Sequence, residues 1–303
     1  MKVGILGLGL AGAGLGMEVR ASLGHTGTVV GFDEDPERTR QSREAGAIDE
    51  AAPDVAMLAA MPLVFVAVGA ASTAEAFRRL SPHLRPGAVV SDISPVKSPG
   101  VLLAGSILPP TVSFVGSHPV EHAGPPGGSG DGRRVWCLTP GRGATPDAIA
   151  TLKDLAIAMD YRPLILTAEE HDLTVGGTHH LPFLARAALL SVVVGSAGWR
   201  DLAPFAATLA AETAPPSVED LAANRAPITH WLGRLQEQLE EIKVTLSAGD
   251  PDAISRLLEE SAGHEISLAS SGEEPREPGF ARRVAEGLFG DRLASIMDPR
   301  PRR

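Results

Sequence analysis

His118 is the residue in this sequence that is best suited to accept a proton. It follows Gly116 and Ser117, directly after the apolar segment 112–115. The pKa of an ordinary imidazole lies near neutral pH, so this side chain can take up a proton at working pH. If the apolar segment is a strand of an open α/β sheet, His118 lies beyond its carboxyl end, where such sheets bind ligands. We therefore predict a general base; the alternative is a histidine bonded to a nearby backbone carbonyl.

Other histidines offer weaker signals. His179 and His180 come eight and nine residues after His171. We expect one of the pair to point toward a bound substrate and the other to be packed. His122 lies four residues after His118, the spacing of a helical metal-binding pair, but the proline- and glycine-rich run around it disfavours a helix, so we predict no metal site.

Three glycines near the start have the spacing of a dinucleotide-binding loop. Gly7, Gly9 and Gly12 follow an apolar segment and begin a helix, and Asp33 ends the next apolar segment. Gly7 allows a tight turn, Gly9 lets the backbone approach a pyrophosphate, and Gly12 lets the helix pack against the strand. The helix N-terminus offers free N–H groups and the positive end of its dipole to phosphates.

The acidic residue at the end of this motif indicates which dinucleotide binds. Asp33 can accept hydrogen bonds from a ribose 2′-hydroxyl and would repel a 2′-phosphate, and no arginine directly follows it. The sequence therefore predicts NAD rather than NADP. The predicted cofactor contacts are Gly7, Leu8, Gly9, Leu10, Ala11, Gly12, Asp33, Val68, Gly69 and Ser94.

Strand-like and helix-like segments alternate through residues 1–167. The predicted strands are 2–6, 29–32, 63–68, 88–92, 112–115, 135–138 and 164–166, and the predicted helices are 10–23, 36–45, 72–80 and 146–159. The segment 63–68 is apolar throughout, which is typical of a parallel strand buried on both faces. The alternation predicts an α/β fold with an N-terminal Rossmann-type domain, a doubly wound parallel sheet.

The pattern changes at Ala168, after which no strand is predicted. Helices are predicted at 184–194, 227–246 and 252–262. The first is apolar nearly all round, which indicates burial in a core or in a subunit interface. We therefore predict an all-helical C-terminal domain at 168–270 that binds substrate and forms a homodimer. Residues 271–303 are predicted to be a linker and a short C-terminal helix or tail.

The overall composition limits the possible partners. The net charge is −10 and no basic run follows a phosphate backbone, so we expect no nucleic-acid partner. The single cysteine, Cys137, lies in an apolar run and is predicted to be a core residue. We find neither a signal-peptide pattern nor an apolar run long enough to cross a bilayer, so the expectation is a cytoplasmic protein without a membrane partner.

These residues resemble the prephenate and arogenate dehydrogenases, from the start of the chain to about residue 270. The motifs are Gly7-Leu-Gly-Leu-Ala-Gly12, Asp92-Ile-Ser-Pro-Val-Lys97, Gly116-Ser-His-Pro119, Leu138-Thr-Pro140, Glu170-His-Asp172, His180-Leu-Pro182, Trp199-Arg-Asp201 and Asn224-Arg225. The resemblance implies a nucleotide domain joined to a helical dimerisation domain, and a role in the biosynthesis of tyrosine or related aromatic compounds.

It also implies an oxidative decarboxylation of a small ring acid. NAD takes a hydride from the ring carbon that bears the 4-hydroxyl group, a histidine takes the hydroxyl proton, and loss of carbon dioxide makes the ring aromatic. His118 matches that histidine, and His180 matches a second family histidine in the substrate cleft. The predicted catalytic residues are His118, Ser94 and His180, and the predicted substrate contacts are Ser117, His118, His179, His180, Arg200 and Arg225.

The sequence departs from the family pattern where the substrate would bind. Pro95 replaces a serine that bonds near the catalytic histidine and the nicotinamide, and Ser94 lies one residue early. Pro204 stands in the position of an arginine that grips a substrate carboxylate, and the segment after Pro119 also differs. Loss of a buried bidentate contact weakens binding unless another arginine replaces it. The candidates are Arg186, Arg200 and Arg225.

Two other functions fit parts of the sequence. A β-hydroxyacid dehydrogenase has a catalytic lysine on a glycine-bearing helix of its second domain, whereas here the helical region offers only Lys243, on the amphipathic helix 227–246. A non-catalytic NAD(H)-binding relative would tolerate both Pro95 and Pro204. Turnover of a ring acid separates this last alternative from an enzyme.

Overall fold

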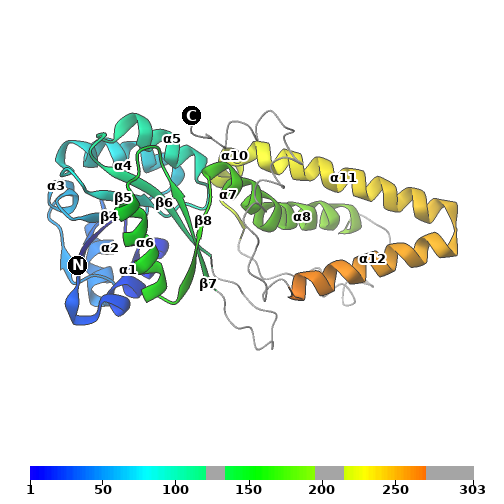
Figure 1. Ribbon diagram of the computed structural model, residues 1–303, viewed down its shortest axis with the longest axis horizontal. Coiled ribbons are helices and arrows are strands. Elements are labelled where there is room, and N and C mark those ends of the chain that lie inside the picture. Colours follow the sequence, from blue (N-terminus) through cyan, green and yellow to red (C-terminus); the bar gives the residue numbers. More distant parts are fainter. Residues whose placement is uncertain (121–133, 195–214, 271–303) are drawn as a thin grey trace, which may run out of the picture. The chain divides into compact units, whose positions relative to one another are not determined.

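The computed structural model describes residues 1–120, 134–194 and 215–270. The contacts between residues divide the chain into two compact units, Met1–Ile228 and Thr229–Arg303. The first unit contains a β-sheet with helices on both faces (Figure 1). The predicted linker and tail at 271–303 lie outside the described residues.

One eight-stranded sheet forms the centre of the first unit. Its strand order is β3-β2-β1-β4-β5-β6-β7-β8. The bounds are β1 (Lys2–Leu6), β2 (Thr28–Phe32), β3 (Glu50–Ala51), β4 (Leu63–Val66), β5 (Val89–Asp92), β6 (Ser113–Val120), β7 (Arg134–Pro140) and β8 (Tyr161–Ile165). This order, with parallel pairing among β1 to β6, confirms the Rossmann-type fold.

The expectation of a wholly parallel sheet is wrong at one pair. β6 and β7 are antiparallel, whereas the other neighbouring strands are parallel. Parallel pairing of consecutive strands needs a crossover, usually a helix. The sequence between these two strands is rich in glycine and proline, which disfavours such a helix.

Helices cover both faces of the sheet. The α-helices of this part are α1 (Leu10–Leu23), α2 (Pro36–Glu44), α3 (Val55–Ala59), α4 (Thr73–Leu80), α5 (Ser98–Ile107) and α6 (Pro146–Ala158), with short 3₁₀ turns η1 (Gly24–Thr26), η2 (Ala70–Ser72) and η3 (Ser81–His83). As predicted, α6 begins behind the N-cap Thr145, whose hydroxyl accepts a bond from the Ala148 N–H. The sequence pattern predicts neither β3 nor α3 nor α5.

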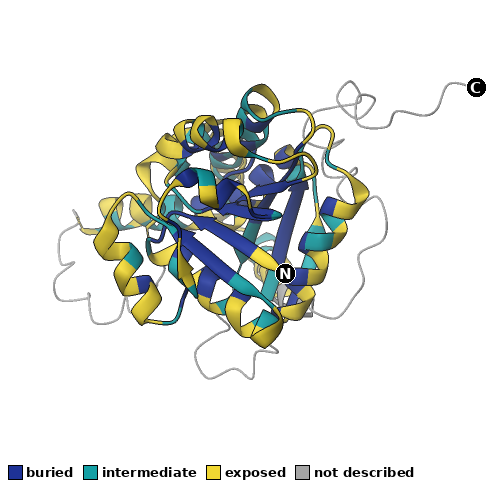
Figure 2. Ribbon diagram, turned by 90° about the vertical axis from the view of Figure 1, so that its left-hand side faces the viewer, coloured by how far each residue is buried: buried dark blue, intermediate teal, exposed yellow. Residues whose placement is uncertain are grey.

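Alternate residues of the strands feed two cores. Val89 and Val115 pack with α1 and α6 on one face, while Val90 and Phe114 pack with α3, α4 and α5 on the other. Figure 2 shows these buried strands between helices whose outer faces are exposed. Cys137 is buried in β7, and burial raises the pKa of its thiol to about 11. Its predicted place in the core is confirmed.

A long helical stretch follows β8. It consists of α7 (Ala168–Val175), the π-helix η4 (Gly176–His180) and α8 (Leu181–Val194). It begins with a capping box, in which the Thr167 hydroxyl accepts from the Glu170 N–H and the Glu170 carboxylate accepts from the Thr167 N–H. No residue of α8 is buried within this chain, so the core alternative for 184–194 is wrong.

This stretch is also long and apolar enough to cross a membrane. Within the described residues, 168–194 is the one helix that passes this test of length and composition. The expectation that no apolar run is long enough is therefore wrong by this measure. The test alone is weak evidence for a membrane span, because helices of soluble proteins pass it too. Here α7 packs against α5 and β7 and buries His171 and Asp172.

The remaining helices are α10 (Val218–Ala223), α11 (Arg225–Ala248) and α12 (Pro251–Ser270). The last two are longer than the predicted 227–246 and 252–262. By contacts, α7, α8 and α10 belong to the first unit, and most of α11 together with α12 belongs to the second. A single helical domain at 168–270 stays a prediction.

Candidate active site

The glycine loop between β1 and α1 has the predicted conformation. Gly7 has a φ of +93°, a value that residues other than glycine rarely adopt. Its N–H donates a 2.8 Å bond to the Phe32 carbonyl. A Cβ built on Gly12 would lie 2.0 Å from the Gly7 carbonyl oxygen, so only glycine fits there. The conformational roles predicted for Gly7 and Gly12 are confirmed.

The N-terminus of α1 is free to meet an anion. Gly9 is the N-cap residue, no side chain caps the helix, and a Cβ built on Gly9 would find no atom within 4 Å. Leu10 and Ala11 are exposed beside it. The Leu8 side chain is buried in the core and its N–H donates to Asp33, so its predicted contact with the cofactor stays a prediction. These observations fit the phosphates of a dinucleotide.

Asp33 lines the pocket beside this loop. Its Oδ2 accepts a 2.7 Å bond from the Leu8 N–H, and its Oδ1 accepts a 2.9 Å bond from the Asp35 N–H. The carboxylate thus ties the glycine loop to the end of β2, which the sequence motif did not show. It retains lone pairs for a ribose hydroxyl, since each oxygen has more than one acceptor position.

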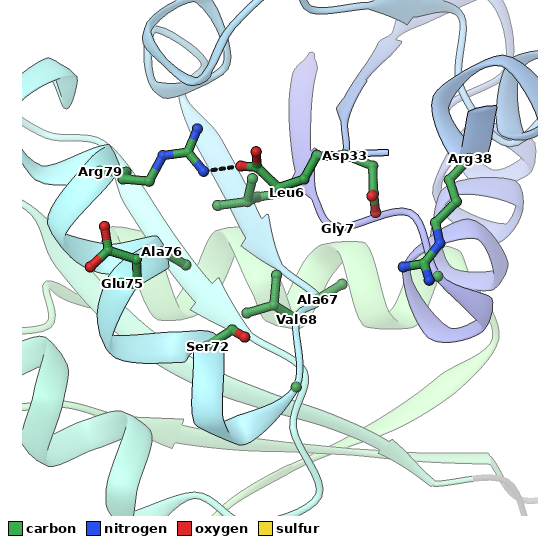
Figure 3. Close-up of a pocket in the computed structure, with 13 residues that line it drawn as sticks. Leu6, Gly7, Asp33, Arg38, Ala67, Val68, Ser72, Glu75, Ala76 and Arg79 are labelled. Atoms are coloured by element: carbon green, nitrogen blue, oxygen red, sulfur yellow. Dashed lines mark hydrogen bonds and ion pairs between the residues drawn. The ribbon is translucent and has the colours of Figure 1, made fainter. Parts of the chain in front are cut away.

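The pocket around Asp33 has a volume of about 580 Å³. Figure 3 shows Arg38 on one side of Asp33 and, across the pocket, Arg79, which is ion-paired with Glu34. Arg79 is 46 residues from Asp33, so the sequence motif does not reveal it, whereas Arg38 follows Asp33 by five residues and was missed because only the directly following position was considered. Residues that line the pocket include the predicted contacts Gly7, Gly9, Asp33, Val68 and Gly69, but not Ser94.

His118 lies inside strand β6, which corrects its prediction as a residue of the following turn. The strand continues beyond its apolar part because β7 pairs with it, and His118 is opposite Cys137. Side chains alternate along a strand, so Ser117 and His118 point to opposite faces. The buried Ser117 hydroxyl accepts a 2.8 Å bond from Ser91. Ser117 is therefore placed away from the side chain of His118.

Two further residues form a chain of hydrogen bonds with His118. Its Nδ1 lies 2.9 Å from Nε2 of His171, and Nδ1 of His171 lies 2.9 Å from Oδ1 of Asp172. The Asp172 carboxylate also accepts bonds from the N–H groups of Lys97 at 2.7 Å and Ser98 at 2.8 Å. The chain thus joins β6, α7 and the start of α5.

The pKa values in this cluster are shifted in consistent directions. Burial lowers the pKa of His118 well below its ordinary 6.5, and the neighbouring His171 and Lys97 lower it further. Burial also lowers the pKa of His171, although the bond to Asp172 opposes this change. For Asp172, burial raises the pKa, but the bonds from His171, Lys97 and Ser98 outweigh it and the pKa is lowered. At neutral pH, Asp172 is charged and both imidazoles are neutral.

A buried lysine supports the same strand. The Lys97 ammonium donates to Asp92 Oδ2 at 2.9 Å, to the Asp92 carbonyl at 3.2 Å and to the Ser117 carbonyl at 2.7 Å. Lys97 is fully buried, which lowers its pKa, and the charge of Asp92 opposes that shift. Lys97 ends the sequence motif 92–97, which by itself indicates no role for this lysine.

Ser94 is turned into its own loop. Its hydroxyl lies 2.5 Å from Asp92 Oδ2 and 2.7 Å from the Val96 carbonyl oxygen. Among the described residues, its side chain makes no hydrogen bond to His118 or His171. The structure therefore does not bring Ser94 together with the predicted base, and its catalytic role stays a prediction.

The two neighbouring histidines of the π-helix have different surroundings. His180 is buried, with Nδ1 3.1 Å from Nδ2 of Asn224, whose amide also donates to the Asp172 carbonyl at 2.9 Å. His179 is exposed, and its ring centroid lies 6.5 Å from that of His118. Thus His179, rather than His180, is the one beside the predicted base. π-Helical turns are frequent at functional sites.

Two of the three arginines predicted as candidates for a carboxylate clamp lie within the described residues. Arg225 is exposed and donates to the Ala222 carbonyl at 3.3 Å. Arg186 is half-buried on α8, with its guanidinium 5.7 Å from the Phe183 ring centroid. Arg200, Pro204 and His122 lie outside the described residues. Across residues 1–120, 134–194 and 215–270, no three acidic, histidine or cysteine side chains gather as a metal site.

Comparisons with known proteins agree with the fold. Residues 15–162 match the family model of the prephenate dehydrogenase nucleotide-binding domain. A prephenate dehydrogenase of Bacillus subtilis (strain 168) is 24% identical over 194 residues, which are 61% of this chain and 52% of that protein. The chain thus spans about half the length of this curated relative.

Solved structures of this kind have the same fold. Synechocystis arogenate dehydrogenase superposes with a TM-score of 0.71 at 22% identity, over 88% of this chain and 100% of the other. Aquifex aeolicus prephenate dehydrogenase superposes with a TM-score of 0.75 at 20% identity, over 88% of this chain and 99% of the other. The Aquifex enzyme has also been solved with hydroxyphenyl propionate and NAD⁺.

The doubly wound sheet and its glycine loop define a dinucleotide-binding domain of the kind found in NAD-dependent dehydrogenases. Residues 15–162 match the nucleotide-binding domain of the prephenate dehydrogenases, and the chain as a whole is similar to prephenate and arogenate dehydrogenases. The resemblance inferred from the sequence motifs is confirmed.

Proposed function

We propose that this protein catalyses the NAD⁺-dependent oxidative decarboxylation of prephenate, arogenate or a closely related cyclohexadienyl acid. Bound in the glycine-loop pocket, NAD⁺ supplies the hydride acceptor. His118 takes the proton of the ring hydroxyl group, so the oxygen can form a double bond to carbon as hydride leaves. The electron pair of the breaking carbon–carboxylate bond then enters the ring, carbon dioxide departs, and the oxygen regains a proton.

The observation that carries this proposal is that His118 is an unprotonated base on a strand that ends at the same edge of the sheet as the nucleotide pocket. Its pKa is held well below 6.5 by burial, so the imidazole is a free base at neutral pH. It also lies on the parallel-paired strand β6, whose carboxyl end is at the same edge of the sheet as the ends of β1 and β4 at the nucleotide pocket. A proton acceptor and a hydride acceptor at one edge suit the oxidation of an alcohol.

Other parts of the site would bind the ring acid. His179 is exposed next to His118, so we propose it as the histidine that meets the substrate. The family resemblance implies that His180 contacts the substrate, and this requires that its buried hydrogen bond to Asn224 break. Arg186, Arg200 and Arg225 remain the candidates for the carboxylate clamp that Pro204 lacks.

We further propose a cytoplasmic homodimer formed through the helical region. The exposed apolar side chains of α8 include Leu189, Val192 and Val194. A second copy of this chain would cover them. On this proposal, the apolar composition of α8 reflects a subunit interface, whereas the apolar residues of α7 pack within the chain.

The direct test is NADH formation from NAD⁺ or NADP⁺ with prephenate and with arogenate. Rapid turnover of either acid with NAD⁺ supports the proposal. Tight NADH binding without turnover of either would instead favour a non-catalytic relative or a different ring acid. The product supplies an independent check, because an aromatic 4-hydroxyphenyl compound and carbon dioxide must appear in equal amounts with NADH.

A further inference from the structure

We infer that His171 and Asp172 are positioning residues that fix the tautomer of His118 and leave its Nε2 free to accept the substrate proton. This inference rests on the proposed role of His118 as base. It gives a function to these two residues of α7, for which the sequence motifs indicate no role.

Asp172 is the fixed end of this hydrogen-bonded chain. Its Oδ1 accepts a bond from the Lys97 N–H at 2.7 Å and its Oδ2 accepts one from the Ser98 N–H at 2.8 Å. Both donors are backbone amides, which cannot reverse their roles. They hold the carboxylate in its charged form, in which it can only accept hydrogen bonds. The nitrogen of His171 that lies 2.9 Å away must therefore carry a proton.

The next link follows from the chemistry of a neutral imidazole. Because Nδ1 of His171 carries the proton, its Nε2 is an acceptor. That atom lies 2.9 Å from Nδ1 of His118. Nδ1 of His118 must then be the donor, and the lone pair is on Nε2 at the other side of the ring. The directions of all the bonds are set by the two backbone amides at the start of α5.

Burial makes this arrangement strict. The side chains of His171 and Asp172 are 1% and 5% exposed, so water does not compete for these atoms. Asn224 donates to the Asp172 carbonyl at 2.9 Å and holds the backbone beside the carboxylate. Pro95 has no hydroxyl group, and the Ser94 hydroxyl is bonded to its own loop. His171 is thus the side chain that holds Nδ1 of His118 among the described residues.

The same contacts also stabilise the protonated form of His118. When Nε2 of His118 takes the proton, its Nδ1–H becomes a charged donor to the neutral His171 and the bond strengthens. The Asp172 charge lies beyond His171 and stabilises the cation. The proton stays on His118, and Asp172 stays ionised throughout the step.

The first test reads the tautomer without any substrate. Protein carrying ¹⁵N only in its nine histidines is studied by NMR at neutral pH. His118→Asn identifies the His118 signals by their loss. We expect a protonated Nδ1 and an unprotonated Nε2 in the wild type. A proton on Nε2 of His118 would overturn the inference, whatever the variants do.

The second test compares two substitutions of the buried histidine. His171→Leu removes the acceptor, so His118 should lose its single tautomer and kcat should fall by about 10²-fold, the lower range of a general-base contribution. The side-chain carbonyl of His171→Gln can accept the His118 Nδ1–H, so it should restore the tautomer and most of kcat. The KM for NAD⁺ should stay unchanged in both. The exposed His83→Gln is the matched control.

The outcomes separate the inference from the proposed function. If the wild type turns over no ring acid, the proposed function fails, yet the NMR result still decides the arrangement of protons. If the wild type is active and the folded His171→Leu variant keeps full kcat, the inference is wrong. Should His171→Leu fail to fold, the wild-type tautomer and the His171→Gln variant decide the question.

Discussion

The Lys97 ammonium donates a 2.7 Å hydrogen bond to the carbonyl oxygen of Ser117, the residue directly before His118. The same ammonium is ion-paired with Asp92 at 2.9 Å, and both side chains are fully buried or nearly so. A single buried cation therefore connects the end of β5 to the part of β6 that carries the predicted base. This link explains why a charged pair lies in the core beside the site.

Replacing Lys97 by Met should destabilise the fold strongly. The buried Asp92 carboxylate would lose its cationic partner, which costs about 3–5 kcal/mol of the free energy of unfolding. Removing both charges in Lys97→Met/Asp92→Asn should recover part of that loss. Urea denaturation measures each change. The exposed Lys153→Met is the control, and an equally large loss there would show that the effect is not specific to the pair.

Replacing His118 by Asn should separate catalysis from cofactor binding. Asn cannot accept a proton near neutral pH, so kcat should fall by about 10²–10⁴-fold. The glycine loop and Asp33 are on other strands, so the Kd for NADH, measured by fluorescence, should stay the same. Unchanged turnover would contradict the assignment of His118 as base.

The dependence of activity on pH follows from the lowered pKa of His118. A base acts only when unprotonated, and burial moves its protonation to a pH below 6.5. We therefore expect kcat/KM to be constant from neutral pH down to 6.5, and to fall about tenfold per pH unit once the pH drops below the lowered pKa. An acid limb centred above 6.5, in profiles with prephenate or arogenate, would show that another group controls the rate.

Local signals were enough to predict the glycine loop and most strands and helices of the nucleotide-binding half of this fold. The turn at Gly7, the close approach at Gly12 and the cap at Thr145 each depend on neighbours within a few residues, and the structure shows all three. The short strand β3 pairs only with β2 through two residues. Too few residues alternate there to give a periodic signal.

The connections within the site could not be predicted in the same way. His118 and His171 are 53 residues apart, and only the packing of α7 against the sheet brings their rings together. The adjacent His171 and Asp172 were a visible signal, because a carboxylate beside a histidine often orients the ring. The placement of Ser117 was missed because the predicted strand ends at residue 115, whereas β6 continues to Val120. Continued alternation through β6 would have placed Ser117 and His118 on opposite faces.

Asp33 should govern the choice between NAD⁺ and NADP⁺. Its charge would repel a 2′-phosphate, while Arg38 in the same pocket would attract one. Asp33→Asn should therefore shift the ratio of kcat/KM values toward NADP⁺ by about tenfold or more, which is about 1.4 kcal/mol. The control is Glu75→Gln, a carboxylate of the pocket that pairs with Arg78. An equal shift in both variants would mean that total charge, not the ribose contact, sets the preference.

A charge on α8 should break the proposed homodimer. Leu189 and Val192 are 45% and 75% exposed in the single chain, and their spacing of three residues puts them on one face of the helix. Burying an unpaired carboxylate between two subunits is unfavourable, so Val192→Glu should give monomers where the wild type gives dimers. Light scattering coupled to gel filtration measures the mass. The control is Leu102→Glu, since Leu102 on α5 is 73% exposed but far from α8 in the sequence. A monomeric wild type would show that there is no such homodimer. Dissociation of the Leu102→Glu control alone would place the interface elsewhere.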